Sequence, residues 1–258
     1  MKNLIRGIFV VALMAGAISM NAQTATQSAP TATPSAATAT PSALTADEIV
    51  GKYVAAIGGK DVISKVKSVS VESSASIMGN DSPNVTTQVD GVGYKSETEF
   101  NGTKIVQCYT DKGGWMVNPM AGAADPTAMP DDVYNTGKGQ IYVGGPLYDY
   151  AAKGSKIELL GKDGNAWKIK LTTKENVDST YEIDSTSFLV TSVQSKGKMQ
   201  DQEVDINTAF SDYRKTDLGY VVPYSISIDF GGQFSFTVAV KKVELNKTID
   251  PAIFAMSK

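Results

Sequence analysis

The chain of 258 residues has no histidine, and its only cysteine is Cys108. Histidine is the usual general base near neutral pH and the commonest metal ligand, so its absence removes most hydrolytic and metal-centred chemistry. A single cysteine excludes an intrachain disulfide and a Cys/His zinc site. Cys108 lies in the strand-like run 105–110, where a small core residue is the expected role. We therefore expect a protein that is not an enzyme, with no catalytic residue, metal site or cofactor.

An excess of basic charge is lacking as well. Lysine and arginine number 24 against 27 aspartate and glutamate residues, and the net charge is −3. Nucleic-acid phosphates call for a basic patch, so no nucleic-acid partner is expected. Paired carboxylates could run glycoside hydrolysis or bind calcium, but an acidic stripe is more often the solvated face of a strand. The residues in question are Asp131, Asp132, Asp201, Glu203 and Asp205.

The N-terminus resembles an export signal. Lys2 and Arg6 precede an almost wholly apolar stretch, 8–18, that is too short to span a bilayer comfortably. Cleavage near Ala22 would complete a signal peptide over residues 1–22. No cysteine directly follows the apolar stretch, so the new N-terminus could not carry a lipoprotein anchor. We expect a periplasmic or secreted protein.

The next segment, 23–43, contains only Gln, Thr, Ala, Ser and Pro. No core can form from this composition, so a disordered tether is predicted. The rest of the chain, 44–258, has a length that suits a single domain, and we expect a monomer.

The domain begins with a helix signal. Thr45 can cap a helix that Glu48 completes as a capping box, and an apolar stripe at helical spacing runs from Ile49 to Ile57. Gly58-Gly59 is typical of a helix end, and a short second helix is expected over about 60–65.

Most of the remaining sequence predicts strands and turns. Apolar residues alternate with polar ones over 220–245, and Gly231-Gly232 favours a two-residue hairpin turn between them. Similar alternations elsewhere bring the expected number of strands to about ten, mainly β with α cover. Such an antiparallel sheet has one apolar face that helices, a second sheet or a ligand must cover.

One segment, 118–153, breaks the strand pattern and is rich in Pro, Gly, Met and Tyr. Short helices are expected to begin at Pro130 and at Pro146. We predict that this insert forms a lid over the apolar face. Methionine suits surfaces that accept varied apolar partners, although plain core packing explains any single methionine equally well. The methionines concerned are Met116, Met120 and Met129, close to Trp115.

The order of helix, short helix, strands, central insert and further strands resembles the LolA/LolB-like lipoprotein carriers and related outer-membrane lipoprotein-sorting-like proteins. The segments that carry the resemblance are 48–60 (EIVGKYVAAIGGK), 66–69 (VKSV), 113–119 (GGWMVNP), 243–246 (VELN) and 249–254 (IDPAIF). The resemblance implies an unclosed antiparallel half-barrel whose concave face, covered by helices, takes acyl chains. Lipoprotein-carrying members close their lid through an arginine in an early strand. Beyond residue 22, the only arginine here is Arg214, so an arginine-closed lid is not implied.

Two hypotheses for function follow. The first is a non-catalytic carrier or binder of lipid or lipoprotein acyl chains in the bacterial cell envelope. The second is an envelope sensor or scaffold of the same fold, with a filled interior and a protein partner. The residues expected to contact acyl chains come from the apolar face and the insert: Trp115, Met116, Met120, Met129, Leu147, Tyr148, Ile226, Ile228, Phe230, Phe234, Phe236 and Val238.

Overall fold

The computed structural model describes residues 44–77, 79–199 and 202–256. The predicted signal peptide (1–22) and tether (23–43) lie outside these residues. None of the helices within the described ranges has the length and apolar character needed to cross a bilayer.

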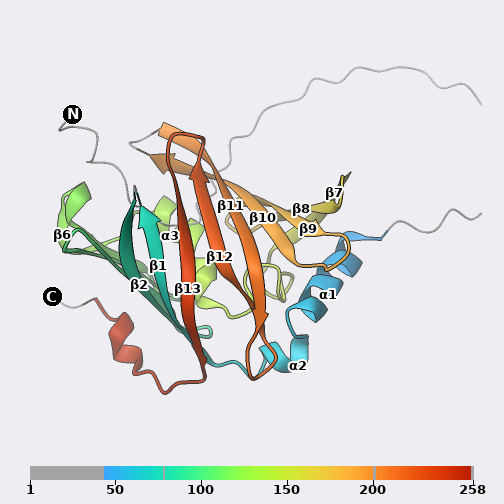
Figure 1. Cartoon of the computed structure of the whole chain (residues 1–258), viewed down its shortest axis with the longest axis horizontal. Coiled ribbons are helices and arrows are strands. Elements are labelled where there is room, and N and C mark those ends of the chain that lie inside the picture. The colour runs from blue at the N-terminus through green and yellow to red at the C-terminus, as the bar shows by residue number, and fades with distance from the viewer. Residues whose placement is uncertain (1–43, 78, 200–201, 257–258) are drawn as a thin grey trace, which may run out of the picture.

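The described residues form one antiparallel sheet of 13 strands in the order β6-β5-β4-β3-β2-β1-β13-β12-β11-β10-β9-β8-β7 (Figure 1). The sheet is unclosed, with β6 and β7 as its two edges, and it curves around the helical segments (Figure 1). The strands are β1 (Ser68–Ile77), β2 (Asn80–Val89), β3 (Gly93–Phe100), β4 (Thr103–Thr110), β5 (Gly114–Asn118), β6 (Ala123–Ala128), β7 (Lys156–Asp163), β8 (Ala166–Thr172), β9 (Asp178–Asp184), β10 (Val190–Met199), β11 (Gln202–Lys215), β12 (Val221–Phe230) and β13 (Ser235–Leu245). The mainly β fold class is confirmed.

The predicted strand count of about ten is wrong. One strand that was not expected, β6, lies inside the insert and pairs with β5. Its sequence, AADPTA, has no apolar alternation because the strand is an edge whose residues are mostly exposed. Backbone pairing alone holds such a strand, and composition does not reveal it.

The N-terminal helix forms as predicted. Helix α1 (Ala46–Ala56) begins with Thr45 and Glu48 in a reciprocal capping box. Ile49, Val50 and Val54 are its buried residues, which confirms the apolar stripe. A short helix, α2 (Lys60–Ile63), follows Gly59.

The insert combines four short elements: η1 (Pro119–Ala121), β6, α3 (Asp131–Gly137) and η2 (Lys138–Ile141). Helix α3 begins after Pro130, as expected. The prediction of a helix beginning at Pro146 is wrong, because residues 143–150 form consecutive turns. Gly144, Gly145 and Asp149 all have positive φ angles, which a right-handed helix does not accommodate.

The loop of the β12–β13 hairpin is one residue longer than predicted. The Phe230 N–H donates to the Phe234 carbonyl at 2.8 Å, so the connection is a three-residue loop, 231–233. This register places Ile228 opposite Phe236 and Ile226 opposite Val238. A two-residue loop would have set each apolar side chain opposite a polar one, because directly paired residues lie on the same face. The alternation therefore outweighs the Gly-Gly turn signal.

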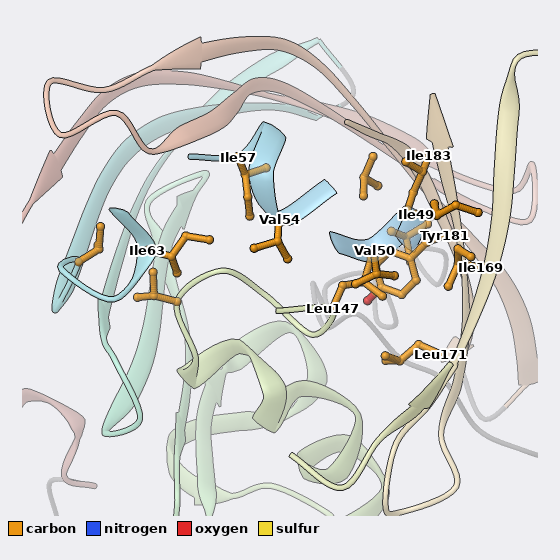
Figure 2. Close-up of a cluster of buried hydrophobic side chains, with 14 of the residues drawn as sticks. Ile49, Val50, Val54, Ile57, Ile63, Leu147, Ile169, Leu171, Tyr181 and Ile183 are labelled. Atoms are coloured by element: carbon orange, nitrogen blue, oxygen red, sulfur yellow. The ribbon is translucent and has the colours of Figure 1, made fainter. Parts of the chain in front are cut away.

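The sheet has two different faces. The inner face is the one on which α1 and the insert pack. There α1 and Leu147 of the insert contact apolar side chains of β8 and β9 (Figure 2). The outer face is mostly polar, except where the C-terminal turn η3 (Pro251–Phe254) covers β4 and β5.

Candidate ligand-binding face

An apolar band crosses the inner face near the β12–β13 turn. We define it by eight buried residues, and six half-buried residues pack against them. The buried set is Ala75, Ile77, Phe100, Ile105, Val204, Ile206, Ile228 and Phe236, and the half-buried set is Met120, Val133, Ile226, Phe230, Phe234 and Val238. The band therefore draws on β1, β3, β4, β11, β12 and β13, with one residue each from η1 and α3.

The strand register builds the band. Ala75, Val238 and Ile226 lie side by side on β1, β13 and β12. Phe230, Phe234 and Phe236 form a ring cluster with centroid separations of 5.8–6.2 Å. Offset aromatic contacts of this length are favourable in addition to the area that they bury. Phe236 is 5% exposed and anchors the cluster, whereas Phe230 and Phe234 keep part of their surface accessible.

The predicted ligand-contact residues separate into four places. The apolar band contains Met120, Ile226, Ile228, Phe230, Phe234, Phe236 and Val238. Met116 and Met129 lie further along the inner face, in a cluster around Tyr109 and Ile141. Leu147 and Tyr148 pack with α1. Trp115 lies on the outer face.

Trp115 and Met116 separate because consecutive strand residues point to opposite faces. The Trp115 indole Nε1–H donates to the Phe254 carbonyl at 2.8 Å, and Cys108 packs beside it at 0% exposure. The prediction that Cys108 is a core residue is confirmed, and its side chain shares the outer face with that of Val106. Burial raises the pKa of the Cys108 thiol to about 12.

Cys108 should resist alkylation in the folded protein. Its thiol is shielded by Phe254, and thiolate, the reactive form, is scarce at a pKa of about 12. A Cβ at Gly93 would lie 2.6 Å from Cγ of Phe254. We therefore expect Gly93→Ala to displace the C-terminal turn and to raise the rate of iodoacetamide labelling at pH 8 more than tenfold. Gly51→Ala, where a Cβ meets nothing within 4 Å, is the matched control. Equal labelling rates in the two variants would contradict this role of Phe254.

The second half of the insert is held by Lys153 and by contacts with the first two helices. The Lys153 ammonium donates to the carbonyls of Gly145, at 3.0 Å, and Tyr148. It also lies 5.0 Å from the ring centroid of Tyr142, a cation–π distance. The Tyr150 hydroxyl donates to Asp47 of α1, and Lys60 of α2 lies 3.5 Å from Asp149. Lys153 therefore holds the segment 142–153 together from within, and Asp149 and Tyr150 attach it to α1 and α2.

Lys153 should make stability depend on pH. Burial lowers its pKa from 10.5 to about 8. Between these values the unfolded chain binds more protons than the folded one, so the free energy of unfolding that Lys153 contributes should rise from about pH 8 to about pH 10. Urea denaturation of the wild type and Lys153→Met at both pH values isolates this contribution from the buried tyrosines. A difference between the two proteins that stays constant or falls with pH would refute the assignment.

A polar belt on the inner face, which the sequence analysis missed, adjoins the apolar band. It comprises Ser73, Ser82, Asn84, Thr86, Ser96, Thr98 and Gln107, on β1 to β4. Asn84 is its centre: its Nδ2 donates to Ser96 and Thr98 at 2.8 Å, and its Oδ1 accepts from Thr86 at 3.1 Å and Ser73 at 3.2 Å. Short polar residues at every second position of β2 and β3 were the available signal.

The acidic residues that the structure describes are not gathered into a metal site. Glu203 and Asp205 pair with Lys196, at 3.5 and 2.5 Å, on the outer face. Asp201 lies outside the described residues. Within those residues there is no group of three or more Cys, Asp or Glu side chains arranged to hold a metal ion. The solvated-face interpretation accounts for Glu203 and Asp205.

Arg214 does not lie beneath a lid. It pairs with Asp212 through bonds of 2.6 and 3.0 Å and stacks on Tyr224, and its side chain is 58% exposed. Asn84 is instead the polar centre on an early strand of this chain.

Neither a protein-family profile nor a curated protein matches the sequence of this chain. Solved structures do match it. A LolA superfamily protein from Nitrosomonas europaea superposes with a TM-score of 0.55 at 12% identity, over 84% of this chain and 99% of that one. An outer-membrane lipoprotein-sorting-like protein domain from Vibrio parahaemolyticus gives 0.53 at 10% identity, over 81% and 97%. A DUF1329 family protein from Desulfovibrio piger gives 0.50 at 13% identity, over 81% and 97%. The predicted resemblance is confirmed at the level of structure: this chain has the fold of the LolA superfamily.

Proposed function

We propose that this protein is a non-catalytic binder or carrier of acyl chains, from a lipid or a lipidated protein, in the bacterial cell envelope. The observation that carries the proposal is the apolar band. Its residues Ile226, Phe230, Phe234 and Val238 are half-buried although they lie on the covered face of the sheet. Among the described apolar side chains of the insert, Met120 and Val133 are the two that pack against it.

The energetics favour an apolar ligand on the band. Each methylene group of an acyl chain removed from water contributes about 0.8 kcal/mol. About fifteen such groups contribute about 12 kcal/mol, which offsets an association cost of about 4 kcal/mol and leaves micromolar affinity, about −8 kcal/mol. A saturated chain also has no polar group that would lose hydrogen bonds against Ile226, Ile228 and Phe230.

The fold and the insert support the same proposal. One structure of this fold is described as an outer-membrane lipoprotein-sorting-like protein domain, which agrees with an exported protein and with the expected signal peptide at residues 1–22. In the proposal, the insert is a lid. It borders the band through Met120 and Val133, and displacement of η1 and α3 would widen access to Phe230 and Phe234.

Mass spectrometry of an organic extract from the purified protein tests the proposal directly. An unrelated exported protein purified in parallel provides the background. We expect a stoichiometric acyl species that is reduced when Phe234 and Phe236 are changed to serine. A clean extract, together with no uptake of a fluorescent fatty acid by the purified protein, would overturn the proposal.

One observation favours the second hypothesis, an interaction module with a filled interior. Insert side chains already occupy the inner face outside the band, through Ile141 over β4 and Leu147 over β8 and β9. Truncation of the insert distinguishes the two functions. It should abolish acyl binding if the insert is a lid, and should mainly lower stability if it is only filling.

A further inference from the structure

The polar belt gives part of the inner face a set of hydrogen-bonding groups that carry no charge. Every inner-face position among the paired, described residues of β1–β4, β12 and β13 is uncharged. A stable apolar core does not require seven polar side chains in its lining, and polar groups on a covered face lower stability unless they are satisfied. The belt therefore calls for a role beyond packing.

Asn84 determines which groups of the belt donate hydrogen bonds and which accept them. The Glu97 carbonyl, 3.3 Å from Nδ2, can only accept a hydrogen bond, which fixes the orientation of the amide. Nδ2 therefore donates to Ser96 and Thr98, while Ser73 and Thr86 donate to Oδ1. Since Thr98 Oγ1 accepts from Asn84, its own proton is directed to another acceptor. Ser96 Oγ also accepts from Asn84, but the Tyr94 hydroxyl lies within hydrogen-bonding reach of Ser96 and can take up its proton.

The belt lies beside the apolar band. Thr98, Asn84 and Ser73 form one row across β3, β2 and β1 that continues to Val240 of β13. The next row contains Ala75 and Val238 of the band. Three strand spacings of about 4.8 Å separate β3 from β13, a span of about 14 Å. An acyl chain of about a dozen carbons lying on the band would thus place its first carbonyl over the belt.

We propose that the polar belt binds the uncharged ester group of an acylglycerol whose hydrocarbon chain lies on the apolar band, with Thr98 donating to the ester carbonyl. This inference rests on the proposed function and names its ligand class. A free carboxylate or a phosphate would lose hydration against the belt and find no cation there. Asp131 and Asp132, adjacent to Val133 in α3, would repel such an anion at the edge of the band.

Competition for a bound dye tests the inference. The purified protein is loaded with N-phenyl-1-naphthylamine, which has no ester, and the dye is displaced with 1-monolauroylglycerol or with laurate at pH 8. We expect the ester to compete at least tenfold better than the carboxylate. Thr98→Val, an exchange of similar volume that removes the hydroxyl, should lower affinity for monolauroylglycerol relative to the dye by about three- to tenfold, the value of one hydrogen bond.

Thr237→Val is the matched control. Thr237 is exposed on the outer face of β13, so its exchange should change neither affinity. Laurate binding as tightly as monolauroylglycerol, or an unchanged affinity ratio in Thr98→Val, would overturn the ester site while dye binding left the proposed function intact. No binding of the dye or of either lipid would overturn the proposed function and this inference with it.

Discussion

Replacing Phe230 and Phe234 together by serine should lower the affinity for N-phenyl-1-naphthylamine about thirtyfold. Complete burial of a phenylalanine side chain contributes about 1.5–3 kcal/mol. Both rings are already half-buried, so about 1 kcal/mol each is available to a ligand, and 2 kcal/mol corresponds to about thirtyfold in the dissociation constant. The increase in dye fluorescence on binding gives both constants.

Because Phe230 and Phe234 are only half-buried, the double variant should stay folded, and a change in its dye affinity can be attributed to the binding site. Phe236 and Ile228 stay in place and hold the β12–β13 pairing, so we expect a smaller loss of stability than from a fully buried phenylalanine. Leu218→Ser is the control, because Leu218 is 46% exposed and precedes β12 at the end of the strand opposite the 231–233 loop. Unchanged dye affinity in the folded double variant would remove the apolar band from the binding site.

The parts of the fold that were predictable from sequence depend on neighbouring residues. The capping box of Thr45 and Glu48 and the short helix after Gly58-Gly59 need only a few adjacent residues, and both formed. The alternation in β12 and β13 also set the register correctly once the loop was three residues long. Predictions from adjacent residues were therefore correct for these elements, each of which buries one face.

The site was harder to predict because it depends on long-range register. Trp115, Met116, Met120 and Met129 are close in sequence, yet they belong to three different clusters. Strand alternation placed Trp115 on the outer face, where residues from the C-terminus cover it. The polar belt went unnoticed because its members come from four strands, and only the pairing of β1 to β4 brings them together.

Gly137→Ala should be the most destabilising single methyl addition in the insert. A Cβ at Gly137 would lie 2.3 Å from Cε1 and Cζ of Tyr109, whose side chain is fully buried on β4. Neither the ring nor the end of α3 can move freely, so we expect a loss near the upper end of the overpacking range, about 3 kcal/mol. Gly139→Ala, two residues further on, meets nothing within 4 Å and should change the free energy of unfolding by less than about 1 kcal/mol.

A double-mutant cycle separates this steric contact from a general effect on α3. Tyr109→Leu removes the clashing ring atoms but keeps an apolar side chain, and alone it should cost about 1–3 kcal/mol. In that background Gly137→Ala should cost less than about 1 kcal/mol, which gives a coupling energy of about 2 kcal/mol or more. Urea denaturation of the four proteins provides the values. Additive effects would mean that α3 is not held against the inner face at Tyr109, and the insert would then rest on the sheet mainly through Leu147 and Lys153.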